Sequence, residues 1–219
     1  MLSFKFRKAL NAVYLSHIDI LKTINKTLRR THIPIDYSRG FNPHMLINMS
    51  QPLSLGIESL AEWATVQTSY DDPQGFLELY NNCCPQGLEA SQCHITQTKP
   101  NIAGKVIASD YFIKNDKAVE IKEILENINK KPFFMEVKSK SGVYEKDVSP
   151  LIYRIKADAD GIYLLSAFGN TNLRCDRFTE KLNQAFNLDI KLRDVTRLNQ
   201  YVDQNGELKE VGEYIKGLL

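Results

Sequence analysis

The sequence predicts an α+β protein made of two tandem ferredoxin-like (βαββαβ) sandwiches. Patterns typical of strands and helices follow the order strand, helix, strand, strand, helix, strand, and the second half repeats that order. Residues 101–104, which follow Pro100, are the expected join. We therefore predict a first domain over residues 1–100, a second domain over residues 104–200 and a C-terminal tail over residues 201–219.

The first half begins with a strand over residues 2–8, because Leu2, Phe4 and Phe6 alternate with polar residues. Apolar residues then recur at spacings of three and four, which predicts a helix that ends near residue 31, with Ser16 as its N-cap. Pro73 suits the start of a second helix, which we expect to end near residue 83. Strands are expected over residues 45–49, 61–69 and 88–97.

The second half repeats these patterns with one additional short element. Helices are expected over residues 119–128 and 174–186, and strands over residues 105–114, 133–138, 151–156, 161–168 and 190–198. The tail contains an Asn205-Gly206 turn and a marginal helix, and we expect it to be a peripheral flap.

Composition excludes several classes of function. Lys and Arg number 28 against 26 Asp and Glu, a net charge of +2, so any surface that binds nucleic acid must be local. The four cysteines form no CxxC motif, and the sequence has no GxxxxGK or GxGxxG loop, so we expect no metal, no cofactor and no ATP or NAD chemistry. The longest apolar runs are too short to span a membrane, and no signal peptide precedes the first strand, which makes the cytoplasm the expected location.

The start of the first helix is the first candidate site. Ser16, His17 and Asp19 lie beside backbone amides that have no partner within the helix, and such an end can hold an anion. His17 could donate a hydrogen bond to that anion or move a proton near neutral pH. The alternative is purely structural: His17 caps the helix and Asp19 complements its dipole.

The same helix carries Lys22, Lys26, Arg29 and Arg30 mostly three or four positions apart. This spacing places cations along one flank, where they could follow a phosphate backbone. A solvated helix face is the alternative, although no acidic residue follows Asp19 on the helix to neutralise the stripe.

The loop over residues 37–44 combines a phenol, a hydroxyl, a guanidinium, an amide and an imidazole around Gly40. Its candidate binding residues are Tyr37, Ser38, Arg39, Phe41 and Asn42, and His44 is a candidate acid or base. Turn chemistry alone could explain part of the loop. If the loop folds back over the helix start, Arg39 and His44 would join His17 there.

Six motifs together resemble one known family: YLSHID (14–19), LRR (28–30), IP (33–34), YS (37–38), GFNPH (40–44) and PLSLG (52–56). They resemble the radical-SAM-associated domain of unknown function, densely over residues 1–65 and more thinly in the rest of the chain. Met45 stands where that family commonly has proline, and Ile18 and Ile20 replace leucines. That domain occurs fused behind cobalamin-binding-type radical SAM proteins, or alone near a ribonuclease of the E/G type and ribosomal proteins. The resemblance implies a partnership, and the chain lacks the three-cysteine motif of radical SAM chemistry.

These observations support three hypotheses. The first is an accessory protein that binds RNA, tRNA or rRNA, through its first helix and the 37–44 loop and acts with RNA modification or processing machinery. The second is a metal-independent ribonuclease that uses His17 and His44 as acid and base. The third is a protein-docking module for a radical SAM enzyme.

Overall fold

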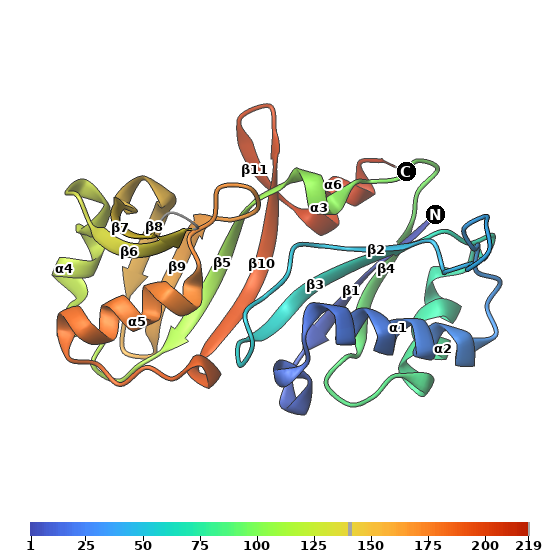
Figure 1. Cartoon of the computed structure of the whole chain (residues 1–219), viewed down its shortest axis with the longest axis horizontal. Helices are drawn as coiled ribbons and strands as arrows, with labels where there is room; N and C mark the ends of the chain where they lie inside the picture. The colour runs from blue at the N-terminus through green and yellow to red at the C-terminus, as the bar shows by residue number, and fades with distance from the viewer. Residues whose placement is uncertain (140–141, 219) are drawn as a thin grey trace.

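The computed structural model describes residues 1–139 and 142–218, which form an α+β protein (Figure 1). Over these residues nine strands join in one sheet of order β4-β1-β3-β10-β5-β9-β8, with β2 beside β3 and β11 beside β10, while β6 and β7 form a separate hairpin. The first half contains β1 (Leu2–Lys8), α1 (His17–Thr31), β2 (Ile47–Met49), β3 (Glu58–Val66), α2 (Pro73–Cys83) and β4 (Ala90–Ile95). The second contains α3 (Ile102–Lys105), β5 (Val106–Lys114), α4 (Lys122–Glu126), β6 (Phe134–Ser139), β7 (Gly142–Asp147), β8 (Ile152–Ala157), β9 (Gly161–Ala167), α5 (Cys175–Phe186), β10 (Val195–Gln204), β11 (Glu207–Glu210) and α6 (Val211–Lys216).

Helices α1 and α2 cover one face of the first half of the sheet. The strands are antiparallel in the order β4-β1-β3-β2, and alternate residues of β1 point toward the helices. Phe4 packs against Phe76 and Tyr80 of α2, with ring centroids 5.1 and 5.0 Å away. From α1, Ile24 and Leu28 close this core without exposure to solvent. The period-two and helical patterns of the sequence are confirmed here.

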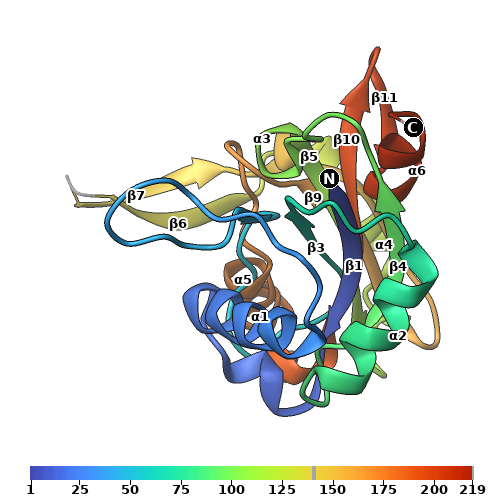
Figure 2. The same cartoon turned by 90° about the vertical axis from the view of Figure 1, so that its right-hand side faces the viewer.

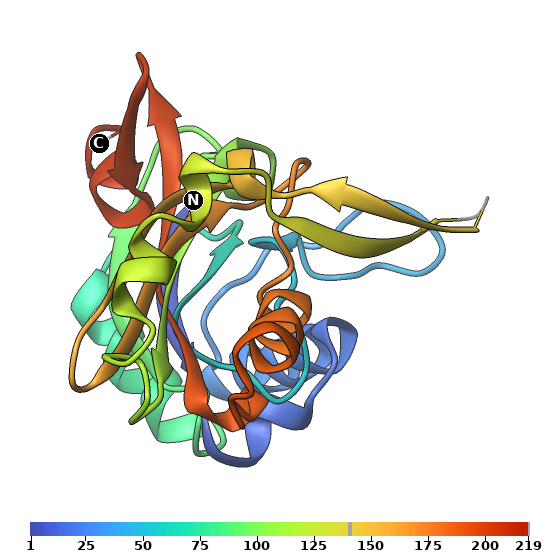
Figure 3. The same cartoon turned by 90° about the vertical axis from the view of Figure 1, so that its left-hand side faces the viewer.

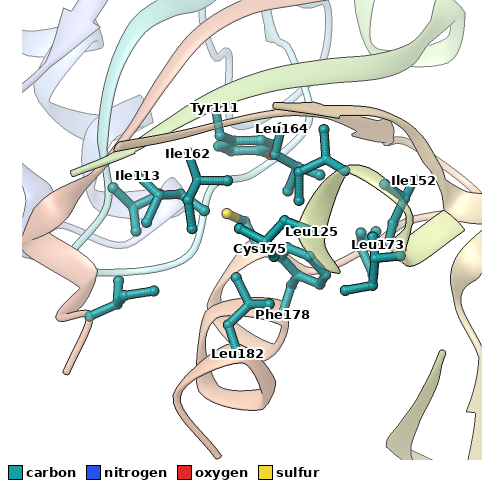
Figure 4. Packing of buried hydrophobic residues seen from close by; sticks show 14 of the residues in the cluster. Tyr111, Ile113, Leu125, Ile152, Ile162, Leu164, Leu173, Cys175, Phe178 and Leu182 are labelled. Carbon is teal, nitrogen blue, oxygen red and sulfur yellow. The ribbon is translucent and has the colours of Figure 1, made fainter. Parts of the chain in front are cut away.

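The second half has the strand order β10-β5-β9-β8, all antiparallel, with α5 against one face. Phe178 and Leu182 of α5 pack on Tyr111, Ile162 and neighbouring strand residues (Figure 4). Cys175 also lies in this core, and burial raises the pKa of its thiol. The amphipathic pattern of residues 174–186 therefore predicted this helix correctly.

The two halves share one continuous sheet. Strands β3 and β10 pair in parallel over two registered positions, Glu58 with Thr196 and Ser59 with Arg197. The sequence analysis did not predict this pair, which joins the sheets of the two halves at their junction. The domain boundaries at residues 100 and 104 stay predictions.

The segment between β5 and β8 differs from its prediction. The helix expected over residues 119–128 is reduced to α4, and the strand expected over residues 133–138 pairs with β7, which the sequence did not reveal. The hairpin β6–β7 projects from the side of the sheet that carries α1 and α5 (Figures 2 and 3). Much of β7 is exposed, so it lacks the apolar alternation that reveals a half-buried strand.

The expected C-terminal flap is wrong, because this segment belongs to the core. Strand β10 continues to Gln204, six residues beyond the expected end, and pairs with β11 through an Asn205-Gly206 turn in which both residues have positive φ. Helix α6 then places Val211 and Ile215 in a third cluster with Trp63 of β3. Because Trp63 lies on the sheet face opposite Ala64 and Val66, α6 covers the face that α1 and α2 leave bare.

This packing predicts that the last helix stabilises the fold. The substitution Ile215→Ala removes a side chain with no exposure to solvent and should lower the free energy of unfolding by about 2–5 kcal/mol. Leu208→Ala in β11, where the side chain is 38% exposed, is the matched control and should cost less than about 1 kcal/mol. Urea unfolding measures both. Equal small losses would show that the helix is peripheral after all.

Candidate functional site

Helix α1 begins at His17 with a reciprocal cap. The Ser16 hydroxyl accepts a hydrogen bond from the Asp19 amide at 3.2 Å and donates to the Asp19 carboxylate at 2.6 Å. Ser16 therefore acts as the predicted N-cap, and Asp19 complements the helix dipole. His17 is half-buried.

The exposed face of α1 carries three cations. Lys22, Lys26 and Arg29 are exposed on the side opposite the buried Ile24 and Leu28. The described residues provide no ion pair for any of the three. The stripe is therefore a free positive surface.

Arg30 has a different role from these three cations. Its Nη2 donates to the Cys83 carbonyl at 2.6 Å, at the C-terminal end of α2. Arg30 thus joins the two helices, and a contact with phosphate would be additional to this structural bond.

The loop over residues 37–44 is closed at its base and open at its tip. The Ser38 amide donates to the His44 carbonyl at 2.8 Å, and the Ser38 hydroxyl lies 2.8 Å from His44 Nδ1. Arg39, Phe41 and Asn42 are exposed at the tip, and Phe41 has 103% of its reference area accessible. The loop therefore combines turn hydrogen bonds at its base with exposed polar and aromatic side chains at its tip.

The expected convergence at the helix start is wrong. The loop lies beyond the C-terminal end of α1, while His17 begins the helix (Figure 1). Fifteen helical residues separate the two ends by about 22 Å. His17 is thus remote from Arg39 and His44, because α1 remains straight and the chain continues past its end instead of folding back.

Three charged residues that the sequence did not single out lie buried near His17. Lys8 is 1% exposed, Glu62 is 3% exposed and Arg197 has no exposure. Lys8 is registered with Ser59, and Ser59 with Arg197, so these side chains lie in one row on one face of the sheet. Glu62 lies opposite Phe6 on that same face.

Arg197 is the centre of this cluster. Its Nη2 forms an ion pair with Glu62 Oε1, its Nε donates to the Ser59 hydroxyl at 3.4 Å, and its guanidinium lies 4.9 Å from the centre of the Phe168 ring. Its Nη1 is buried and has no partner among the described residues. Lys8 also has no hydrogen-bond partner there, so two cations share one carboxylate.

The charges of this cluster affect the pKa of His17. Burial is the main cause that lowers the pKa of His17, with Glu62 opposing it and both Lys8 and Arg197 lowering it further. Burial likewise lowers the pKa of Lys8, again opposed by Glu62. His17 is therefore held neutral near pH 7 and can accept a proton.

A period-two pattern could have revealed these charges. Lys8 continues the buried phase of Leu2, Phe4 and Phe6, and Arg197 continues that of Val195, whereas Glu62 lies in an unbroken run of buried residues from Ala61 to Val66. A charged residue in the buried phase of a strand is uncommon unless it has a partner or a function. The partners could not be assigned from sequence, because the three strands are far apart in the chain.

The family comparison covers most of this arrangement. A family described as "Uncharacterized protein conserved in bacteria (DUF2344)" matches residues 2–174. The chain belongs to this family. The matched region includes α1, the 37–44 loop, Lys8 and Glu62, and it ends before Arg197. No curated protein matches the chain.

Within residues 1–139 and 142–218, no three His, Cys, Asp or Glu side chains come together as metal ligands. The helices in those ranges are all too short or too polar to cross a bilayer.

The shared carboxylate predicts a large effect on stability. Glu62→Gln leaves Lys8 and Arg197 without a counter-charge in the interior, which should cost about 3–5 kcal/mol. The control is Glu180→Gln, which breaks an exposed pair of Glu180 with Arg177 at 2.8 Å and should cost less than about 1 kcal/mol. Urea unfolding at pH 7 measures the free energy of unfolding of both variants. Similar losses would mean that the buried pair contributes no more than a surface one.

Proposed function

We propose that this protein binds RNA through phosphate contacts from the exposed face of α1 and the tip of the 37–44 loop. The observation that carries the proposal is the line formed by Lys22, Lys26 and Arg29, whose charges the described residues leave unpaired. Spacings of four and three residues keep the three side chains on one side of the helix. Such a line suits the repeating charges of a nucleic-acid backbone.

The loop extends this surface past the end of the helix. Arg39 can contact a further phosphate, and the fully exposed ring of Phe41 can stack on a base. Tyr37, Ser38 and Asn42 add hydrogen-bonding groups beside them. The corrected geometry thus supports an extended surface of about 22 Å or more instead of a single site at the helix start.

The resemblance described above extends the proposal to partners. We propose tRNA or rRNA as the bound RNA, a radical SAM protein or a ribonuclease of the E/G type as the partner, and the cytoplasm as the location. We also propose that each half is a ferredoxin-like unit. The supporting observation is that both halves follow the element order strand, helix, strand, strand, helix, strand, with the fourth, first, third and second strands side by side.

Salt dependence tests the RNA proposal. Replacing Lys22, Lys26 and Arg29 together with Gln should weaken binding at least tenfold at low salt and reduce the slope of log affinity against log salt by about 2, since each phosphate contact on single strands contributes about 0.7. Fluorescence anisotropy with a labelled RNA at several salt concentrations measures both quantities. The matched control replaces Lys114, Lys156 and Lys209, which are exposed on β5, β8 and β11. If both triple variants lose the same affinity, binding is diffuse and the proposal is wrong.

A ribonuclease is the second candidate, and the state of His17 favours it. A neutral imidazole beside Lys8 can accept the proton of a ribose hydroxyl while the cation stabilises the charged phosphate. His17 begins α1, and the loop that contains His44 lies beyond the other end of this helix, so the two side chains cannot act as acid and base on one bond. Cleavage of cellular RNA in the presence of a chelator should be lost in His17→Ala and retained in His44→Ala. Cleavage unaffected by His17→Ala would exclude this mechanism.

Protein docking is the third candidate, and exposed apolar side chains on the same surface favour it. Ile18 is 62% exposed at the start of α1, and Phe41 is fully exposed at the loop tip. Affinity purification with nuclease treatment should then recover a partner protein that Ile18→Ser and Phe41→Ser release. If the partner protein is recovered only when RNA is left intact, the result supports RNA binding instead of protein docking.

A further inference from the structure

The buried cluster carries more positive than negative charge. Lys8 and Arg197 are buried with Glu62 as their shared carboxylate, and Arg197 Nη1 has no partner among the described residues. Gln200, whose Oε1 is also unpartnered, lies further along the same strand and donates to Ser50 and to the Ala61 carbonyl. An uncompensated cation in the interior is expensive unless it is neutralised or bound by an anion.

The start of α1 adds donors beside this charge. The amides of Asp19 and Ile20 are bonded to Ser16, whereas those of His17 and Ile18 have no acceptor among the described residues. His17 is half-buried, whereas Lys8, Glu62 and Arg197 are interior, so His17 has the most contact with solvent of the four residues. The carboxylate of Asp19 is the negative group on this turn, and it accepts a hydrogen bond from Ser16.

We propose that one phosphate group binds here, held by Lys8, the His17 ring and the first two amides of α1, with Arg197 behind them. A phosphate monoester carries a charge of about −1.5 to −2 and three acceptor oxygens, which match one excess cation, one imidazole and two amides. Glu62 holds Arg197 in place, and the bound phosphate neutralises Lys8. Lysine binds phosphate as a point charge and needs no planar geometry.

This site is separate from the proposed RNA surface. It uses none of Lys22, Lys26, Arg29 and Arg39, and it requires only a phosphate group. That group can belong to a small phosphate compound or to the end of an RNA. The phosphate-site proposal is therefore independent of the proposal that α1 binds a nucleic-acid backbone.

Thermal unfolding with inorganic phosphate is the first test. At ten times its dissociation constant, phosphate should raise the Tm of the full chain by about 3 °C over chloride of equal ionic strength. Lys8→Met should remove this rise yet fold, because it removes a buried charge and keeps a similar volume. Lys22→Met, on the exposed face of α1, should retain it.

The half-buried His17 provides a second variant that does not depend on Lys8 being replaceable. His17→Phe keeps a ring and loses both nitrogens, and it should reduce phosphate affinity at least tenfold. The proposal is overturned if phosphate does not raise the Tm of the wild type. It is also overturned if phosphate still raises the Tm of both Lys8→Met and His17→Phe.

RNA ends distinguish the two sources of the phosphate. A short RNA with a 5′-phosphate should bind more tightly than its 5′-hydroxyl form if the site takes RNA ends, and Lys8→Met should abolish that preference. Equal affinities, together with a retained effect of inorganic phosphate, assign the site to a small phosphate compound. RNA binding that is unchanged in the α1 triple variant, together with a retained phosphate response, would refute the RNA proposal alone.

Discussion

The ion pair between Arg197 and Glu62 joins the two halves at the point where they have least backbone contact. Strands β3 and β10 are registered at only two positions, and beyond Arg197 the side chain of Gln200 bridges to the Ala61 carbonyl. Side chains therefore replace a ladder of backbone bonds at the junction. A buried ion pair contributes little net stability, but separating its partners leaves an unpaired charge in the interior. The pair therefore favours the arrangement of the two halves in which Arg197 and Glu62 meet.

Local structure followed from the sequence, whereas contacts between distant segments did not. Ser16 predicted the start of α1 correctly because a cap depends on residues three positions apart. The length of β10 and the docking of α6 on Trp63 depend on a sheet face that only the assembled fold creates. The expected meeting of His17 with His44 was wrong for the same reason, since it required knowing how the chain leaves a straight helix. The polar residues from Ser16 to His44 could be found in the sequence, but their separation along α1 could not.

The positive charges of this protein occur in two physically different settings. On the outer face of α1 they are hydrated, so salt shortens the range of their electric field and each contact with such a charge contributes little free energy. Lys8 and Arg197 are desolvated, so each interaction with a negative group is stronger and salt screens it less. A net charge of +2 conceals this division, because acidic residues elsewhere balance the total.

Helix α1 connects these two settings. Its core-facing side packs through Ile24 and Leu28, which fixes the helix as a rigid rod on the sheet. Its start, at His17, interacts electrostatically with Lys8, Glu62 and Arg197, and its end, about 22 Å away, leads to the exposed loop (Figure 1). A backbone lying along the hydrated face would thus have one end near the desolvated cations, where a terminal phosphate meets the strongest field. Rigid packing of the helix keeps that separation constant, so the distance between the two sites would select the length of strand that can contact both.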